Sequence, residues 1–79
     1  MRVRLRFFAA LREQMGARSE RSVPAGTTVG MLWRSLVGER PTLGAVTVRF
    51  AVNEEYVEAS HPLGEGDEVA FLPPVSGGG

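Results

Sequence analysis

The stretch EVAFLP, residues Glu68–Pro73, has the pattern of a strand with apolar side chains on both of its faces. One face carries Val69 and Phe71. The other carries Ala70 and Leu72, because successive side chains of a strand point to opposite sides. A strand that is apolar on both sides is typical of the interior of a sheet. We therefore expect this last strand to be central.

The neighbour of this central strand is predicted to be the first strand of the chain. In RVRLRF, Arg2–Phe7, arginines alternate with valine, leucine and phenylalanine. This is the period-two pattern of a half-buried strand with one wet face. Arg18–Val23 is polar and ends at the turn residues Pro24–Gly26, which predicts a second strand at an edge of the sheet.

Two more strands are predicted as a hairpin. Val46–Val52 has apolar residues at alternate positions, so Val46, Val48, Phe50 and Val52 would share one face. A tight reversal at Asn53–Glu54 or Glu54–Glu55 then leads into a short strand, YVEA, over Tyr56–Ala59.

Two helices are predicted between these strands. The shorter lies in Phe8–Gly16, where Leu11 and Met15 are four residues apart and Gly16 can end the helix. The longer begins at Thr27 or Thr28, whose side-chain oxygen can cap free backbone N–H groups. Its apolar positions follow the helical period: Val29, Leu32, Trp33, Leu36 and Val37. We expect it to end at Gly38, with a loop over Pro41–Ala45.

The length of 79 residues allows one small domain with one hydrophobic core. The elements predict an α+β fold, with a mixed sheet of about five strands packed on one main helix plus a short helix. We expect residues 1–74 to form the domain and residues 75–79 to form a flexible glycine tail.

The composition excludes several classes of function. Nine basic residues, all arginine, balance nine acidic ones, so no net field favours nucleic acid or an anionic membrane. The chain has no cysteine and therefore offers no thiolate nucleophile or metal ligand. Neither a signal peptide nor an apolar run of membrane-spanning length is visible. A cytoplasmic protein is expected.

The polar side chains do not predict a catalytic site of the chain's own. His61 precedes a proline, with no second imidazole or thiol for a metal site. Glu54 and Glu55 are adjacent at the hairpin, so they diverge and cannot act as an acid–base pair. Gly64–Asp67 is expected to be a turn, because no helix follows to bind a phosphate. The arginine face of the first strand favours solvent or an acidic protein partner over RNA.

Three apolar residues fall on the opposite side from the inward-facing set. Phe8, Ala70 and Leu72 would form a partner-docking surface if they are exposed. A strand that is buried on both faces would give the same pattern.

The end of the chain is the strongest candidate for a working part, although a frayed terminus would have the same composition. It comprises Pro73, Pro74, Val75, Ser76, Gly77, Gly78 and Gly79. Two prolines stiffen the exit from the strand, and the five residues after them can project roughly 17 Å. Glycines have no side chain, so they can enter a narrow channel and deliver a carboxylate. Activation by ATP as an acyl-adenylate, followed by sulfide or persulfide, would convert it to a thiocarboxylate.

The segment GDEVAFLPPVSGG, residues 66–78, resembles the C-terminal signature of the small subunits of molybdopterin synthase, a family of ubiquitin-like sulfur carriers. VRLRFFAALRE, PAGTTV, AVNEEYV and HPLGEGDEV occur in the order typical of that family. The resemblance implies a β-grasp fold. It also implies that an adenylating enzyme consumes ATP to charge the terminal glycine, and that a sulfur donor such as a cysteine desulfurase forms the thiocarboxylate.

The resemblance further implies a heterotetramer of two small and two large subunits. The large subunit would receive the tail and pass its sulfur to a cyclic pyranopterin precursor, with no cofactor stably bound to the small one. Family members usually end in Ser-Gly-Gly, whereas this chain has a third glycine. Gly79 is expected to react, and the alternative is that trimming exposes Gly78. The alternative functions are a related carrier for tRNA thiolation, cysteine or thiazole synthesis, and a ubiquitin-like modifier.

Overall fold

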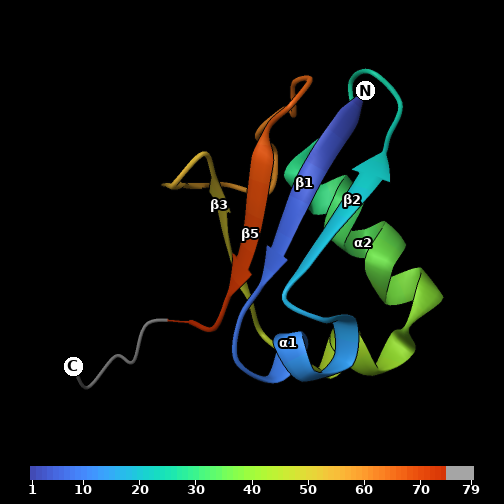
Figure 1. Cartoon of the computed structure of the whole chain (residues 1–79), viewed down its shortest axis with the longest axis vertical. Coiled ribbons are helices and arrows are strands. Elements are labelled where there is room, and N and C mark those ends of the chain that lie inside the picture. Colours follow the sequence, from blue (N-terminus) through green and yellow to red (C-terminus); the bar gives the residue numbers. More distant parts are fainter. Residues whose placement is uncertain (75–79) are drawn as a thin grey trace.

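The computed structural model describes residues 1–74 of the chain (Figure 1). Its elements, in chain order, are β1 (Arg2–Phe7), α1 (Ala10–Met15), β2 (Arg18–Ser22), α2 (Val29–Glu39), the 3₁₀ helix η1 (Pro41–Ala45), β3 (Arg49–Val52), β4 (Glu55–Val57) and β5 (Glu68–Leu72). The strands form one sheet, and α2 lies across one of its faces.

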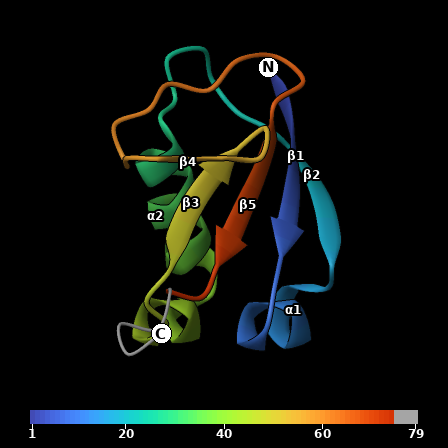
Figure 2. The same cartoon turned by 90° about the vertical axis from the view of Figure 1, so that its left-hand side faces the viewer.

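The sheet has the strand order β2-β1-β5-β3-β4 (Figure 2). β5 pairs in parallel with β1 and antiparallel with β3, so the predicted central position beside the first strand is confirmed. β2 lies at an edge, as its polar sequence predicts. The predicted α+β, β-grasp arrangement of a mixed five-stranded sheet on one main helix is therefore confirmed.

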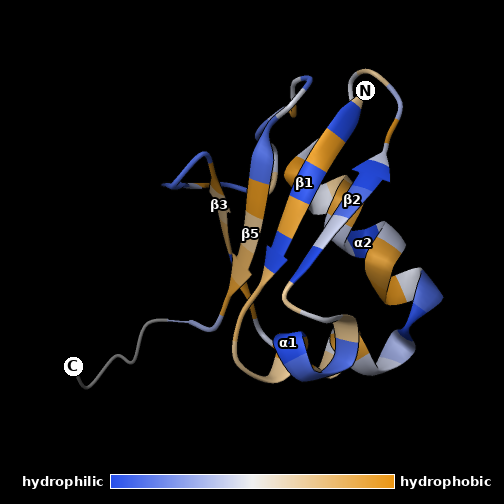
Figure 3. Cartoon of the chain, viewed as in Figure 1, coloured by the Kyte–Doolittle hydropathy of each residue, from blue (hydrophilic) through white to orange (hydrophobic). Residues whose placement is uncertain are grey.

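The main helix α2 is held by a cap and an apolar stripe. Of the two predicted caps, Thr27 and Thr28, the cap is Thr28, whose side-chain oxygen accepts a hydrogen bond from the Met31 backbone N–H at 3.2 Å. Val29, Leu32 and Leu36 are buried against the sheet. Figure 3 shows the matching alternation of polar and apolar residues along β1. The opposite face of the sheet is left without a helix within residues 1–74.

The core is organised around Phe71, the penultimate residue of the central strand β5. Its side chain is fully buried. Its ring centroid lies 5.5 Å from that of Phe7, 5.1 Å from that of Trp33 and 5.9 Å from that of Phe50. Such aromatic pairs add stabilisation beyond their buried area. Phe71 thus anchors in the core the strand that leads to the tail.

The third strand is shorter than predicted. It begins at Arg49 and not at Val46, because its partner β5 ends at Leu72, directly opposite Arg49. Pro73 then has no N–H with which to extend the ladder. The Val46 N–H instead donates to the Leu43 carbonyl at 3.0 Å, and the preceding predicted loop is the 3₁₀ helix η1.

Other element ends also differ from the predictions. The first helix begins at Ala10 and excludes Phe8, because Ala9 has a φ of 53° that is incompatible with a right-handed helix. α2 passes the predicted stop at Gly38 and ends at Glu39. Its C-terminal cap is Arg40, which precedes Pro41. The fourth strand spans Glu55–Val57 in place of Tyr56–Ala59.

The hairpin reversal is the first of the two predicted alternatives. Asn53 and Glu54 both have positive φ angles, 51° and 71°. Val52 pairs with Glu55 across them. Two left-handed residues between paired strands match the twist of a tight hairpin.

One ion pair ties the sheet edge to the helix. Arg21 on β2 donates two hydrogen bonds to the Glu39 carboxylate at the end of α2, the Nη2–Oε1 bond being 2.6 Å long. These bonds raise the pKa of Arg21 and lower the pKa of Glu39 below its ordinary value of 4.5. Because the pKa of Glu39 is lower in the folded chain, its contribution to stability is present above the ordinary value and is lost as pH falls through the lowered one.

Candidate functional site

The tail leaves the body from the end of the central strand. Leu72 is the last residue of β5, and Pro73 and Pro74 follow it as exposed residues. The predicted tail residues Val75, Ser76, Gly77, Gly78 and Gly79 lie outside the described residues. The described chain therefore leaves the sheet beside the last residue of β1 and the first residue of β3.

An apolar hollow lies at this exit. It has a volume of about 240 Å³, and its lining includes Phe8, Leu11, Val46, Pro73 and Pro74. Ala9, which also lines it, holds the positive φ described above. A strained backbone of this kind costs about 1–3 kcal/mol and is often found at functional sites. The prolines are thus flanked by an apolar surface made by the β1–α1 corner.

The structure brings Phe8, Ala70 and Leu72 together on the open face of the sheet. They line a groove of about 230 Å³ that also includes Ala51 and Tyr56. Phe8, Ala70 and Leu72 are each half-buried, and no helix of residues 1–74 lies over them. Of the two explanations for their apolar character, burial beneath an element of residues 1–74 is therefore excluded.

Two uncharged residues of the groove, Ala51 and Tyr56, were not predicted from the sequence. Ala51 is directly opposite Ala70 on one side and Tyr56 on the other. Tyr56 is 57% exposed although it is aromatic, and the Arg49 guanidinium lies 4.2 Å from its ring centroid. Alternation across the two-residue hairpin turn was the available signal, since it places Tyr56 and Ala51 on the same face.

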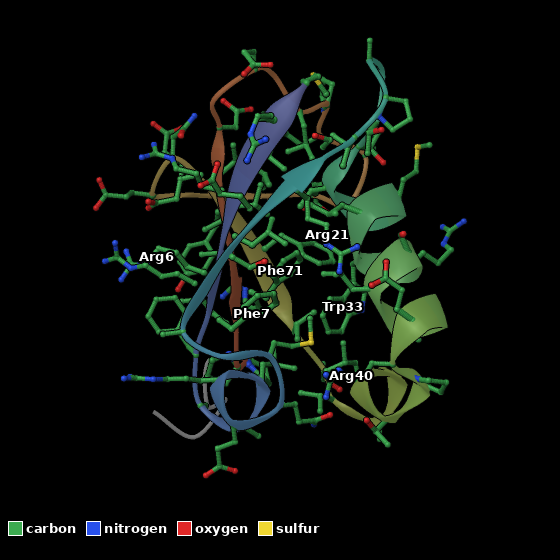
Figure 4. All side chains as sticks on the ribbon, turned by 45° about the vertical axis from the view of Figure 1, so that its right-hand side comes forward. Arg6, Phe7, Arg21, Trp33, Arg40 and Phe71 are labelled. Atoms are coloured by element: carbon green, nitrogen blue, oxygen red, sulfur yellow. The ribbon has the colours of Figure 1, made fainter. Side chains whose placement is uncertain are left out.

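Charged groups border the apolar groove. The Arg6 guanidinium lies 5.2 Å from the centroid of the Phe8 ring and 3.6 Å from the Glu68 carboxylate. Arg6 projects from the side of the sheet that faces away from Trp33 and α2, whereas Phe7 and Phe71 point toward the helix (Figure 4). The open face therefore combines an apolar centre with arginine at its margin.

Two of the polar segments considered above contribute hydrogen bonds to the fold. The Asp67 carboxylate accepts hydrogen bonds from the Gly64 N–H at 2.7 Å and the Asn53 side-chain amide at 3.0 Å, so Gly64–Asp67 is a turn. The His61 carbonyl accepts from the Val29 N–H at 3.0 Å. Within residues 1–74, no three histidine, cysteine or acidic side chains are grouped to hold a metal. No helix in that range is long and apolar enough to cross a membrane.

The profile of the ThiS family matches residues 5–78, which is nearly the whole chain. The chain belongs to the ThiS family. Its relatives include proteins named molybdopterin synthase sulfur carrier subunit from Homo sapiens and Mycobacterium tuberculosis. Each is 40% identical to it; the human alignment covers 96% of this chain and 93% of the relative, and the mycobacterial one covers 99% of each. The predicted resemblance is therefore confirmed.

Two solved structures are similar to this ThiS-family chain over almost all of its length. Small archaeal modifier protein 1 of Haloferax volcanii gives a TM-score of 0.80 at 28% identity, covering 94% of this chain and 98% of its own. A chain from the complex of subunits 1 and 2 of molybdopterin-converting factor of Helicobacter pylori gives 0.69 at 27% identity, covering 98% and 99%. Both confirm the fold.

Proposed function

We propose that this ThiS-family chain is the sulfur-carrier subunit of a molybdopterin synthase. The observation that carries the proposal is the full-length similarity to proteins of that name. The anchored strand supports it, because β5 passes directly into Pro73–Pro74 and the glycine-ended segment. Gly79 is the residue proposed to carry sulfur.

The proposed chemistry begins with activation of the Gly79 carboxylate. An adenylating partner joins that carboxylate to the α-phosphate of ATP, and pyrophosphate leaves. The terminal sulfur of a persulfide on a donor such as a cysteine desulfurase then displaces AMP, so that a C–S bond replaces the C–O bond to the adenylate. A thiol of the donor or of a partner reduces the S–S bond of the resulting acyl disulfide, forming a new disulfide and releasing the thiocarboxylate. The large subunit receives the resulting thiocarboxylate and transfers its sulfur to a cyclic pyranopterin. Hydrolysis returns the carboxylate. Partners supply the catalytic side chains, and this chain supplies the sulfur and the extended tail that delivers it.

The open sheet face is proposed as the surface that docks the large subunit. Phe8, Ala70 and Leu72 lie beside the tail exit, so a protein seated on them would also be positioned to receive the tail. Exposed contiguous apolar surface is typical of protein interfaces. The Helicobacter pylori complex supports the existence of a large-subunit partner.

The proposed function is tested by the intact mass of the chain. We expect incubation with ATP, an adenylating partner and a sulfur donor to raise the mass by the difference between one sulfur and one oxygen atom. Adding the large subunit and the pyranopterin precursor should restore the original mass and yield molybdopterin. Sulfur loading without molybdopterin would instead indicate a carrier for another acceptor, such as tRNA, cysteine or thiazole synthesis.

Replacement of Leu72 tests the docking surface. We expect Leu72→Ser to weaken binding to the large subunit about 10-fold or more, because a central apolar contact of an interface contributes more than 1 kcal/mol. Met31→Ser is the matched control, since Met31 is 52% exposed and lies on α2. Calorimetric titration of folded variants gives the affinities. Equal losses in the two variants would contradict docking through the open face.

Protein modification is the second candidate function. It is favoured by the similarity to small archaeal modifier protein 1, whose name describes a modifier. In this case the activated glycine would form amide bonds with amines of other proteins. Mass-shifted adducts on those proteins, with no sulfur-loaded form of the chain, would support modification and contradict the carrier function.

A further inference from the structure

A second hollow on the open face gathers arginine side chains from two strands. It has a volume of about 360 Å³ and lies over β1 and β2. Its charged lining consists of Arg4, Arg6 and Arg18 together with Glu20 and Glu68. The lining has more guanidinium groups than carboxylates, so the hollow is positively charged although the whole chain is neutral.

The strand register places two like charges opposite each other in this hollow. Arg6 pairs with Arg18 across the antiparallel β1–β2 ladder, an arrangement that is destabilising when nothing neutralises it. Arg6 has Glu68 at 3.6 Å. Glu20, which is opposite Arg4, bonds to Arg2 at 3.0 Å.

The result is an unbalanced pair of arginines. Among residues 1–74, no carboxylate lies within 4 Å of the guanidinium groups of Arg4 and Arg18. Both residues are exposed. The free chain thus keeps two exposed cations that are available to an outside anion.

The arginine hollow is continuous with the proposed docking groove. Arg6 and Glu68 line both, so a protein that covers Phe8, Ala70 and Leu72 also reaches the hollow. At such a margin, complementary charge fixes register and suppresses wrong partners. The anion that pairs with the arginines of the hollow should therefore come from the protein that covers the groove.

We propose that the hollow formed by Arg4, Arg6 and Arg18 receives an aspartate or glutamate side chain of the large subunit. This inference rests on the proposed function. Arg4 and Arg18 have no carboxylate partner within residues 1–74, and guanidinium groups bind carboxylates with directional hydrogen bonds. A phosphate dianion matches less well, because Glu20 and Glu68 line the same space.

The test compares Arg18→Gln with Arg34→Gln. Both remove one exposed arginine, but Arg34 lies on α2 and does not line the hollow. We expect Arg18→Gln to weaken binding of the large subunit about 5- to 10-fold at low salt. Arg34→Gln should remain within about two-fold. The difference should disappear at about 1 M NaCl, where the screening length is about 3 Å.

A structural role for Arg18 would predict a lower thermal midpoint for the free Arg18→Gln variant. We instead expect this midpoint to be unchanged or raised, because the substitution removes a like-charge neighbour of Arg6. Equal affinities of the two variants at low salt, with wild-type binding intact, would overturn this inference and leave the proposed function standing. If the wild-type chain did not bind the large subunit at all, both this inference and the proposed function would be overturned.

A titration with inorganic phosphate tests whether the hollow binds a small anion instead of a protein carboxylate. The free chain can be titrated with it at constant ionic strength while the amide resonances of β1 and β2 are followed by NMR. We expect shifts no larger than those caused by chloride. Saturable shifts confined to the arginine hollow would show a small-anion site and overturn the assignment to a protein carboxylate.

Discussion

A chain extended by one tryptophan after Gly79 should acquire no sulfur when it is mixed with ATP, a purified adenylating partner and a sulfur donor. The extension converts the proposed reacting carboxylate of Gly79 into an amide, which ATP cannot adenylate. It also adds a bulky side chain to a segment whose glycines suit a narrow channel. Intact mass measures the outcome. The expected result is complete loss of the sulfur-loaded form, the largest functional effect predicted for any change to this chain.

The matched variant is a chain that lacks Gly79 and ends at Gly78. Its carboxylate is available, but the tail is shorter by about 3.5 Å. If Gly79 carries the sulfur, this variant should transfer sulfur to the large subunit at a different rate from the full chain. Unchanged transfer, together with a mature protein that ends at Gly78, would contradict the assignment to Gly79.

Replacement of Phe71 by alanine should remove a large part of the free energy of unfolding of the domain. The side chain is fully buried and contacts three other aromatic rings, so its loss should cost about 3–5 kcal/mol. A domain of this size has a free energy of unfolding of about 4–12 kcal/mol. Urea denaturation followed by the fluorescence of Trp33, whose ring centroid is 5.1 Å from that of Phe71, gives the change.

Tyr56→Ala is the control for the Phe71 measurement. It removes an aromatic side chain of similar size that is 57% exposed on the open face. The expected cost is about 1 kcal/mol or less, because little buried surface is lost. If Phe71→Ala were no more destabilising than Tyr56→Ala, the core would not be organised around the central strand.

The centre of the fold was predictable from sequence because it depends on local patterns. Apolar residues on both faces identify β5 as central, and the alternation in Arg2–Phe7 identifies its neighbour. Strand ends were less predictable, since they depend on where a partner strand stops. β3 begins at Arg49 only because Leu72 is the last residue of β5. The 3₁₀ helix at Pro41–Ala45 is too short to show a periodic pattern.

The candidate site also contains residues that the sequence pattern predicts and residues that only the strand register reveals. Alternation alone placed Phe8, Ala70 and Leu72 opposite the inward-facing residues, and the structure gathers them in one groove. Recognising Ala51 and Tyr56 required the register across the β3–β4 hairpin. The opposition of Arg6 and Arg18 required the register of β1 and β2, which no single strand reveals.

The parallel pairing of β1 with β5 also bears on how the protein is made. It joins Arg4–Phe7 to Glu68–Phe71, so the centre of the sheet combines the first and last strands of the fold. On a ribosome, the strand that completes the sheet is therefore the last to emerge. Pairings so distant along a chain form late and slowly, and incomplete chains expose apolar surface. A product that terminates before residue 71 lacks Phe71, so a folded body that carries the tail requires synthesis through β5.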